Sequence, residues 1–176
     1  MDLKEKIRSV PDFPKKGILF RDITTLLKDA QALNEVIRQF KEYYVKKGVK
    51  FNKVVSAESR GFIFGAILAH EFNAGFVPVR KPGKLPAKTI RQEFETEYST
   101  DAFEIHEDAI KKGDRALIID DLLATAGTCL AAISLVERLG GEVVGCGFLI
   151  ELSFLKGSEK LKEYDVFSLI EYKSEE

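Results

Sequence analysis

A short apolar stretch that runs into two adjacent carboxylates constrains the fold of this chain more than any other feature. The stretch is Ala116–Ile119, and its shortness and β-branched content are typical of a strand buried on both faces. Asp120 and Asp121 follow directly, and Ala124–Thr128 is then a turn of small and hydroxylated residues. Such an order predicts a strand, an acidic end and a tight turn.

The residues after this turn show the spacing of an amphipathic helix followed by a second strand. Leu130, Ile133, Val136 and Leu139 recur at helical spacing, and glycines 140–141 end the pattern. The apolar run at 143–150 is the next strand. The segments together predict a β-α-β unit.

This unit has the chemistry of a phosphate site. A helix N-terminus carries unpaired N–H groups and about half a positive charge, and Thr125 and Thr128 can add hydroxyl donors. Asp120 and Asp121 could hold a sugar diol or the water shell of Mg²⁺. The alternative is that the acid pair merely ends a strand and that the turn binds nothing.

Composition favours one ordinary globular domain. The 176 residues have a formal net charge of −1 and no repeat or linker, so we expect a single domain, 1–176, that binds neither nucleic acid nor membrane. The N-terminus lacks a secretory pattern, so a cytoplasmic protein is expected. Cys129 and Cys146 match no metal spacing and are interpreted as buried thiols in a reducing compartment.

Strand and helix patterns alternate along most of the chain. A short helix is expected over 3–10, and a longer one that Asp29 caps and Gly48 ends. Another helix is expected at 62–72, with strands at 53–55, 76–79, 103–106 and 166–170. We therefore predict an α/β fold with a mainly parallel twisted sheet flanked by helices.

Two further segments could bind anions. The turn Ala57–Gly61 joins a strand to a helix and includes Arg60, which suits a diphosphate, although a plain loop with a surface ion pair is equally compatible. Arg80 and Lys84 belong to a basic, Pro- and Gly-containing run after the next strand. A charge run is usually a solvated face, but this one follows a strand end, where substrates collect.

Other segments carry weaker signals. Phe20, beside Arg21, is by itself more typical of a core residue than of a base-stacking platform. Residues 88–102 have little apolar periodicity, and we expect a flexible flap with some hairpin character there. His106 is expected to point outward from its strand.

The central stretch resembles the signature for phosphoribosyl pyrophosphate (PRPP) of the type I phosphoribosyltransferases. Two hydrophobic residues, an Asp pair and an Ala-Thr-x-Gly-Thr loop make the match. The resemblance implies that Asp120 and Asp121 face the ribose hydroxyls and that Ala124–Thr128 hold the 5′-phosphate. Many relatives have Gly at the position of Ala126, and we expect Ala126 at negative φ, with Gly127 in any left-handed turn.

Six stretches in order resemble one narrower family, the adenine phosphoribosyltransferases. They lie at 18–23, 57–62, 79–86, 97–98, 116–129 and 151–157. The resemblance implies transfer of adenine to PRPP, giving AMP and pyrophosphate in purine salvage. It also implies a homodimer, a hood at 1–30 and a flexible catalytic loop at 88–102. Mg²⁺ is expected to be held through PRPP and water near Asp120 and Asp121, without direct protein ligands.

The same resemblance assigns roles to individual residues. It places adenine among Leu19, Phe20, Arg21 and Leu152, and the acid/base role on Glu97 with Tyr98 beside it. It assigns the binding of pyrophosphate to Ala57, Glu58, Ser59, Arg60, Gly61, Arg80 and Lys84. It assigns the binding of the ribose and 5′-phosphate to Asp120, Asp121, Ala124, Thr125, Ala126, Gly127 and Thr128.

Two other functions stay open at this point. An enzyme for a 6-oxopurine base would usually carry a Lys on a strand after the phosphate loop, and no Lys lies between Ala116 and Leu155. A PRPP- or purine-sensing regulator would need a nucleic-acid domain or a basic face, which the composition does not favour.

Overall fold

A five-stranded parallel sheet forms the centre of the protein. The computed structural model describes residues 1–95 and 100–175. The strands lie in the order β4-β3-β7-β8-β9. Their bounds are β3 Lys53–Ala57, β4 Gly75–Val79, β7 Arg115–Leu123, β8 Glu142–Leu152 and β9 Val166–Tyr172. The predicted parallel sheet is confirmed.

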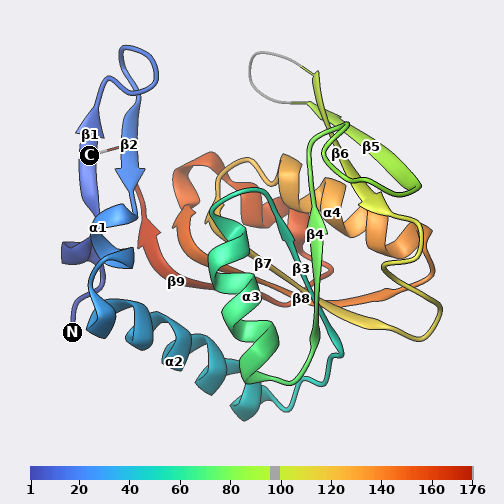
Figure 1. Cartoon of the computed structure of the whole chain (residues 1–176). Coiled ribbons are helices and arrows are strands. Elements are labelled where there is room, and N and C mark those ends of the chain that lie inside the picture. The colour runs from blue at the N-terminus through green and yellow to red at the C-terminus, as the bar shows by residue number, and fades with distance from the viewer. Residues whose placement is uncertain (96–99, 176) are drawn as a thin grey trace.

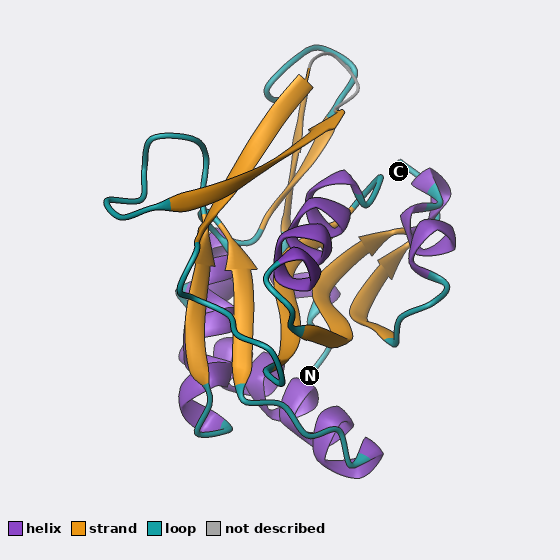
Figure 2. Ribbon diagram, turned by 90° about the vertical axis from the view of Figure 1, so that its right-hand side faces the viewer, coloured by secondary structure: helices purple, strands orange, loops and turns teal. Residues whose placement is uncertain are grey.

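Helices cover both faces of this sheet (Figures 1 and 2). The helices α2 (Ala30–Lys47) and α3 (Gly61–Glu71) pack on one face and α4 (Gly127–Arg138) on the other. Successive β7 residues alternate between the two cores, since Ile118 belongs to the α4 side and Ile119 to the α2–α3 side. This explains why β7 reads as a continuous apolar run.

The predicted boundaries of α2 are confirmed. The Asp29 carboxylate accepts hydrogen bonds from the backbone N–H groups of Gln31 (3.0 Å) and Ala32 (3.2 Å). Gly48 ends the helix in the left-handed conformation, with φ of 67°.

The strand order brings two strand-to-helix turns together. From β3 the chain proceeds outward to β4, whereas from β7 it proceeds in the opposite direction to β8 and β9. Neighbouring strands β3 and β7 therefore form the point where the order reverses, and their carboxyl ends leave a crevice there. The turns after Ala57 and Leu123 both open into this crevice.

The N-terminal segment differs from the prediction. The expected helix over residues 3–10 is wrong: only η1 (Lys4–Lys6) is helical, and β1 (Arg8–Pro11) is extended. β1 pairs antiparallel with β2 (Leu19–Asp22), which stands beside the main sheet as a small hood (Figure 1). Pairing with a distant segment outweighs the weak helical spacing, because β1 buries little apolar surface by itself.

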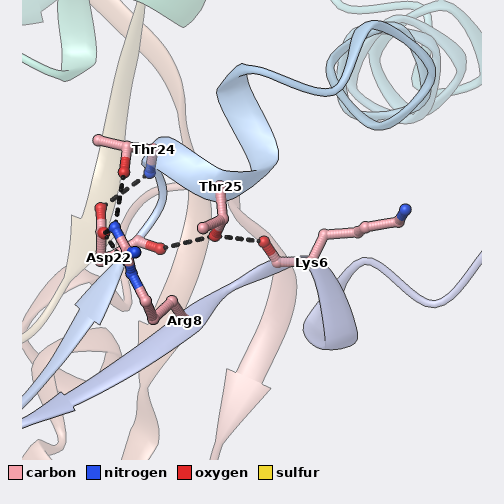
Figure 3. Close-up of polar contacts among 5 residues, drawn as sticks. All are labelled: Lys6, Arg8, Asp22, Thr24 and Thr25. Carbon is pink, nitrogen blue, oxygen red and sulfur yellow. Dashed lines mark hydrogen bonds and ion pairs between the residues drawn. The ribbon is translucent and has the colours of Figure 1, made fainter.

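Asp22, the last residue of β2, joins the two strands of the hood to each other and to the start of the next helix (Figure 3). The Asp22 carboxylate pairs with the Arg8 guanidinium and accepts a hydrogen bond from the Thr24 N–H at 2.9 Å. These contacts lower the pKa of Asp22 to about 2, the Arg8 hydrogen bond being the main cause. Thr25 donates its hydroxyl to the Lys6 carbonyl at 2.7 Å, joining α1 (Thr24–Leu27) to the end of η1.

The flap segment contains an antiparallel hairpin, in line with the hairpin character expected there. Its strands are β5 (Thr89–Glu95) and β6 (Thr100–His106), and the ribbon extends beyond the end of the main sheet (Figure 2). β5 also docks on α4, where the Ser134 hydroxyl donates to the Gln92 side-chain oxygen at 2.8 Å.

The remaining elements are short. The 3₁₀ turns η2 (Ser153–Leu155) and η3 (Gly157–Leu161) link β8 to β9. The thiols of Cys129 and Cys146 are free and buried, as predicted. Across the described residues, none of the helices has the length and apolar character needed to cross a membrane.

Candidate active site

The phosphate loop sits between β7 and the N-terminus of α4. β7 continues through Asp120 and Asp121 to Leu123, so the acid pair lies within the strand rather than after it. Residues 124–126 form the turn and Gly127 is the first helical residue. The first N–H groups of α4 therefore point out of this turn, as an anion site requires.

Our expectation for the turn was wrong. Ala126, not Gly127, has the left-handed conformation, with φ of 69°. The chain must reverse within three residues, and Gly127 already has helical geometry. The absence of a side chain at Gly127 has another cause: a Cβ there would lie 3.1 Å from the Glu95 carbonyl oxygen of β5.

Two residues that sequence reasoning did not assign brace this loop. A Cβ on Gly157 would lie 2.2 Å from the Ala124 carbonyl oxygen, so η3 can approach the loop only through a glycine. Lys160 donates to the Thr125 carbonyl at 3.1 Å. The only sequence signal for Gly157 was its place at the end of the 151–157 match.

The acid pair is packed tightly against the turn after β3. Asp121 is 7% exposed, and its carboxylate lies 2.9 Å from the Arg60 Nε. Asp120 accepts a hydrogen bond from the Asp121 N–H at 2.9 Å. Burial, and then the neighbouring Asp121 charge, raise the pKa of Asp120 well above its ordinary value. A ligand that brings positive charge or hydroxyl donors would offset the free-energy cost of ionising Asp120.

The same acid pair explains a glycine in the neighbouring turn. A Cβ on Gly61 would lie 2.6 Å from the Asp120 Oδ1. Gly61 is also the first residue of α3, so the end of β7 and the start of α3 are in direct contact.

Arg60 joins this region to the hood. Its guanidinium carbon lies 5.0 Å from the centre of the Phe20 ring, while its Nε pairs with Asp121. Phe20 also meets Phe13 edge to face at 5.0 Å. The hood and the end of β7, which are distant in sequence, thus both contact this one arginine.

A cavity of about 500 Å³ lies beneath the hood. It brings together the phosphate loop and three of the four predicted adenine residues; Phe20 is not among the residues that line it. Sequence reasoning did not assign Lys16, Phe94 or Phe154, although Phe154 lies in the 151–157 match. The cavity is lined by Lys16, Gly17, Ile18, Leu19, Arg21, Phe94, Glu95, Ala124, Thr125, Gly127, Thr128, Leu152, Phe154, Leu155 and Glu175.

A second cavity of about 250 Å³ adjoins the first at the phosphate loop. It combines the acid pair with the turn after β3. Its lining residues are Ala57, Glu58, Ser59, Arg60, Phe103, Asp120, Asp121, Leu122, Ala124, Thr125, Ala126, Gly127 and Thr128. The predicted ribose and 5′-phosphate residues are thus brought together with the pyrophosphate residues Ala57–Arg60, and Gly61 lies directly behind Asp120.

The basic run after β4 lies outside both cavities. Arg80 and Lys84 line neither cavity. The Glu58 carboxylate faces Arg80, with its oxygen 3.2 Å from the Arg80 Nε, and accepts a hydrogen bond from the Lys81 N–H at 2.9 Å. Glu58 therefore orients this loop, which is a more suitable role for a carboxylate than direct contact with pyrophosphate.

Two predicted groups stand apart from this geometry. Glu97 and Tyr98 lie outside the described residues. Within residues 1–95 and 100–175, no cluster of three or more His, Cys, Asp and Glu side chains could hold a metal ion. Two carboxylates, one of them paired with Arg60, fit a cation that is held mainly by ligand and water oxygens.

Known proteins resemble this chain in sequence and in fold. A family model for the phosphoribosyl transferase domain matches residues 22–175. An adenine phosphoribosyltransferase of Acetivibrio thermocellus is 58% identical over 172 residues, which cover 98% of this chain and 100% of that protein. One of Halothermothrix orenii is 56% identical and covers 97% of this chain and 99% of its own.

Solved structures of adenine phosphoribosyltransferases also resemble this chain. The crystal structure of adenine phosphoribosyltransferase from Thermoanaerobacter pseudethanolicus superposes with a TM-score of 0.94 at 54% identity, covering 97% of this chain and 98% of that one. The Saccharomyces cerevisiae enzyme, crystallised with adenine and an imino-altritol bisphosphate, gives 0.90 at 41% identity and covers 95% and 96%. The chain therefore belongs to the phosphoribosyltransferase family and, within it, to the adenine phosphoribosyltransferases.

Proposed function

We propose that this chain transfers the phosphoribosyl group of PRPP to N9 of adenine, giving AMP and pyrophosphate for purine salvage. The observation that carries this proposal is the meeting of the two cavities. One contains an anion-binding helix terminus beside two carboxylates, and the other places apolar and aromatic walls next to the same helix terminus. A sugar phosphate with a leaving group on one side and a flat base on the other matches that layout.

The phosphate end of PRPP is the part most closely specified. The 5′-phosphate would bind the N–H groups at the start of α4 and the hydroxyls of Thr125 and Thr128. The ribose hydroxyls would then donate to Asp120 and Asp121, which are acceptor-only groups when ionised. Pyrophosphate would lie at Ala57–Gly61 with Arg60, and Arg80 and Lys84 would approach it from the loop that Glu58 holds.

Adenine would occupy the larger cavity. Leu152 offers an apolar wall and Leu19 a backbone edge, with Arg21 close by. Phe20 stands next to this space in contact with Arg60, so its use as a stacking platform requires Arg60 to turn toward pyrophosphate. Adenine would then take the place of the Arg60 guanidinium on the Phe20 ring.

The chemistry follows from this placement. N9 of adenine attacks C1 of the ribose as the bond to pyrophosphate breaks, and the cationic side chains stabilise the negative charge of the departing group. Mg²⁺ bound with PRPP would supply further charge neutralisation. Glu97 would manage the proton of the base, with Tyr98 beside it, and enclosure of the site would keep water from the cation-like ribose.

A panel of bases tests the activity. The protein would be incubated with PRPP and Mg²⁺ and, separately, with adenine, hypoxanthine, guanine or xanthine, and the nucleotide products would be separated. AMP from adenine alone is expected. A product only from an oxopurine would replace adenine as the substrate, whereas PRPP binding without any product would favour a sensing protein.

A homodimer is supported by the outer face of α3. Phe62, Ile63, Ala66 and Ile67 are at least partly exposed there, and Ile63 is 37% exposed. A helix with apolar residues all round is normally covered, and a second copy is the proposed cover. Sedimentation of the protein and of Ile63→Lys tests this, with a dimer and a monomer expected. The two buried thiols support a reducing, cytoplasmic location.

A further inference from the structure

Tyr172 lies at the junction of the hood and the C-terminal end of the sheet. It is the last residue of β9 and is 5% exposed. Two cations from the N-terminal part of the chain lie on its ring. The Arg21 guanidinium carbon is 4.0 Å and the Lys4 Nζ 4.4 Å from the ring centre. β9 runs toward the hood hairpin, as Figure 1 shows.

Arg21 is held from three sides. Besides the Tyr172 ring, its guanidinium donates to the Ser9 hydroxyl on β1 and to the Glu175 carbonyl at 3.0 Å. Arg has many rotamers, so fixing it in one position costs conformational entropy that these contacts must offset. A stacked, planar partner suits a guanidinium better than a single hydrogen bond does.

Tyr172 is also tied to a second residue that lines the larger cavity, Leu152. In the β8–β9 register Tyr172 is the partner of Leu152, and the Ser153 hydroxyl donates to the Tyr172 carbonyl at 3.2 Å. Leu152 and Arg21 both line the cavity, whereas Tyr172 does not. Tyr172 thus connects two walls of a cavity that it does not itself line.

We propose that Tyr172 is a positioning residue for the nucleobase: its ring fixes Arg21, and with it the hood, at a set position relative to Leu152. This inference rests on the proposed adenine site. Because the Tyr172 ring contacts Arg21 of the hood and does not itself line the cavity, it acts only on the half of the site that the hood forms. Its loss should therefore affect adenine and leave the PRPP half, built on β3, β7 and α4, unchanged.

Steady-state kinetics of Tyr172→Leu and Tyr172→Phe test the proposal. We expect the leucine variant to raise KM for adenine by about 5- to 20-fold, as loss of a buried cation–ring contact implies, and to leave KM for PRPP within about twofold. The phenylalanine variant keeps the ring and should restore the wild-type value. Tyr164→Leu is a matched control, because Tyr164 hydrogen-bonds Glu137 and packs on the opposite core.

A ring of unchanged shape separates this role from simple packing. Pentafluorophenylalanine at position 172 reverses the charge distribution of the ring, and we expect KM for adenine to rise relative to Tyr172→Phe while thermal stability stays the same. This comparison also serves if Tyr172→Leu does not fold. Equal KM values for the two ring variants, or equal increases in both KM values for Tyr172→Leu, would overturn the proposal.

A double-mutant cycle separates this inference from the adenine site itself. If Tyr172 acts through Arg21, then Tyr172→Leu should add little in an Arg21→Leu background. If Tyr172→Leu instead raises KM for adenine in that background as much as it does in the wild type, the role of Tyr172 is overturned and the adenine site is not. If Arg21→Leu leaves KM for adenine unchanged, this inference fails while the adenine site stands, whereas the absence of AMP from adenine in the base panel would overturn both.

Discussion

The Nε of Arg60 lies 2.9 Å from the Asp121 carboxylate, so a cation of the pyrophosphate turn is paired with an acid of the ribose site. Asp121 is nearly buried, and the side chain of Arg60 is about one-third exposed. Without ligand, each group neutralises the other. We infer that PRPP separates them, since its diphosphate competes for Arg60 while its ribose hydroxyls donate to Asp121.

Asp121→Asn should therefore weaken the use of PRPP while leaving the fold intact. Asparagine keeps the shape, and Arg60 can turn toward solvent when it loses its partner. Loss of a charged acceptor for the ribose should raise KM for PRPP by about 10- to 100-fold. Initial rates at varied PRPP measure this, with Asp165→Asn, remote from both cavities, as the control. Unchanged kinetics would remove Asp121 from the site.

Gly61→Ala should reduce catalysis through Asp120. The added methyl would lie 2.6 Å from the Asp120 Oδ1, a distance that forces the carboxylate or the start of α3 to move. A displacement of this size near reacting groups lowers rates by about 100-fold, so kcat/KM for PRPP should fall strongly.

Gly75→Ala is the matched control for Gly61→Ala. A Cβ at Gly75 would meet its nearest neighbour, the Lys53 side chain, at 3.4 Å, which is ordinary contact. Its kinetics should equal those of the wild type. Equal losses in the two variants would mean that a methyl group at either site disturbs the fold in general rather than Asp120.

Ala126→Gly should change stability little, although it relieves a left-handed alanine. Relief of the backbone strain favours glycine by about 1–2 kcal/mol. Against this, glycine loses a buried methyl worth about 0.8 kcal/mol and gains unfolded-state entropy worth about 0.4–1 kcal/mol. Since Ala126 is only 3% exposed, these effects nearly cancel.

Urea unfolding of the wild type and Ala126→Gly checks this balance. We expect free energies of unfolding within about 1 kcal/mol of each other, because the opposing terms are of similar size. A gain well above that range would show that the methyl contributes nothing to packing. A comparable loss would show that the turn is not strained.

The balance at Ala126 also shows where sequence reasoning reached its limit. The order of strand, acid pair, small turn and helix was readable because burial on both faces of β7 leaves a continuous apolar run. The φ of Ala126 was not readable, because it depends on the direction in which α4 leaves the turn. Local patterns carry no information about that direction.

Contacts between distant segments were equally hidden. Arg60 and Asp121 meet because β3 and β7 are neighbours, and Tyr172 meets Arg21 because the hood folds back over β9. Neither pairing follows from spacing along the chain. The N-terminal helix was mispredicted for the same reason, since β1 is extended only because β2 pairs with it.

Asp22→Asn should make stability less dependent on pH in acid. The pKa of Asp22 is lowered to about 2 in the folded protein from 3.8, so between these values the unfolded chain binds more protons. Its contribution is present in full above pH 3.8 and is lost as the pH falls through 2. Because Arg8 is largely exposed, we expect this contribution to be only about 1–2 kcal/mol.

Urea unfolding at several pH values tests the role of Asp22. At pH 6 the Asp22→Asn variant should be less stable than the wild type, and the difference should shrink steadily as the pH is lowered toward 2. The exposed Asp108→Asn serves as the control for loss of one negative charge. A difference that stays constant with pH would mean that the amide disturbs the Thr24 contact, rather than that the charge on Asp22 stabilises the hood through Arg8.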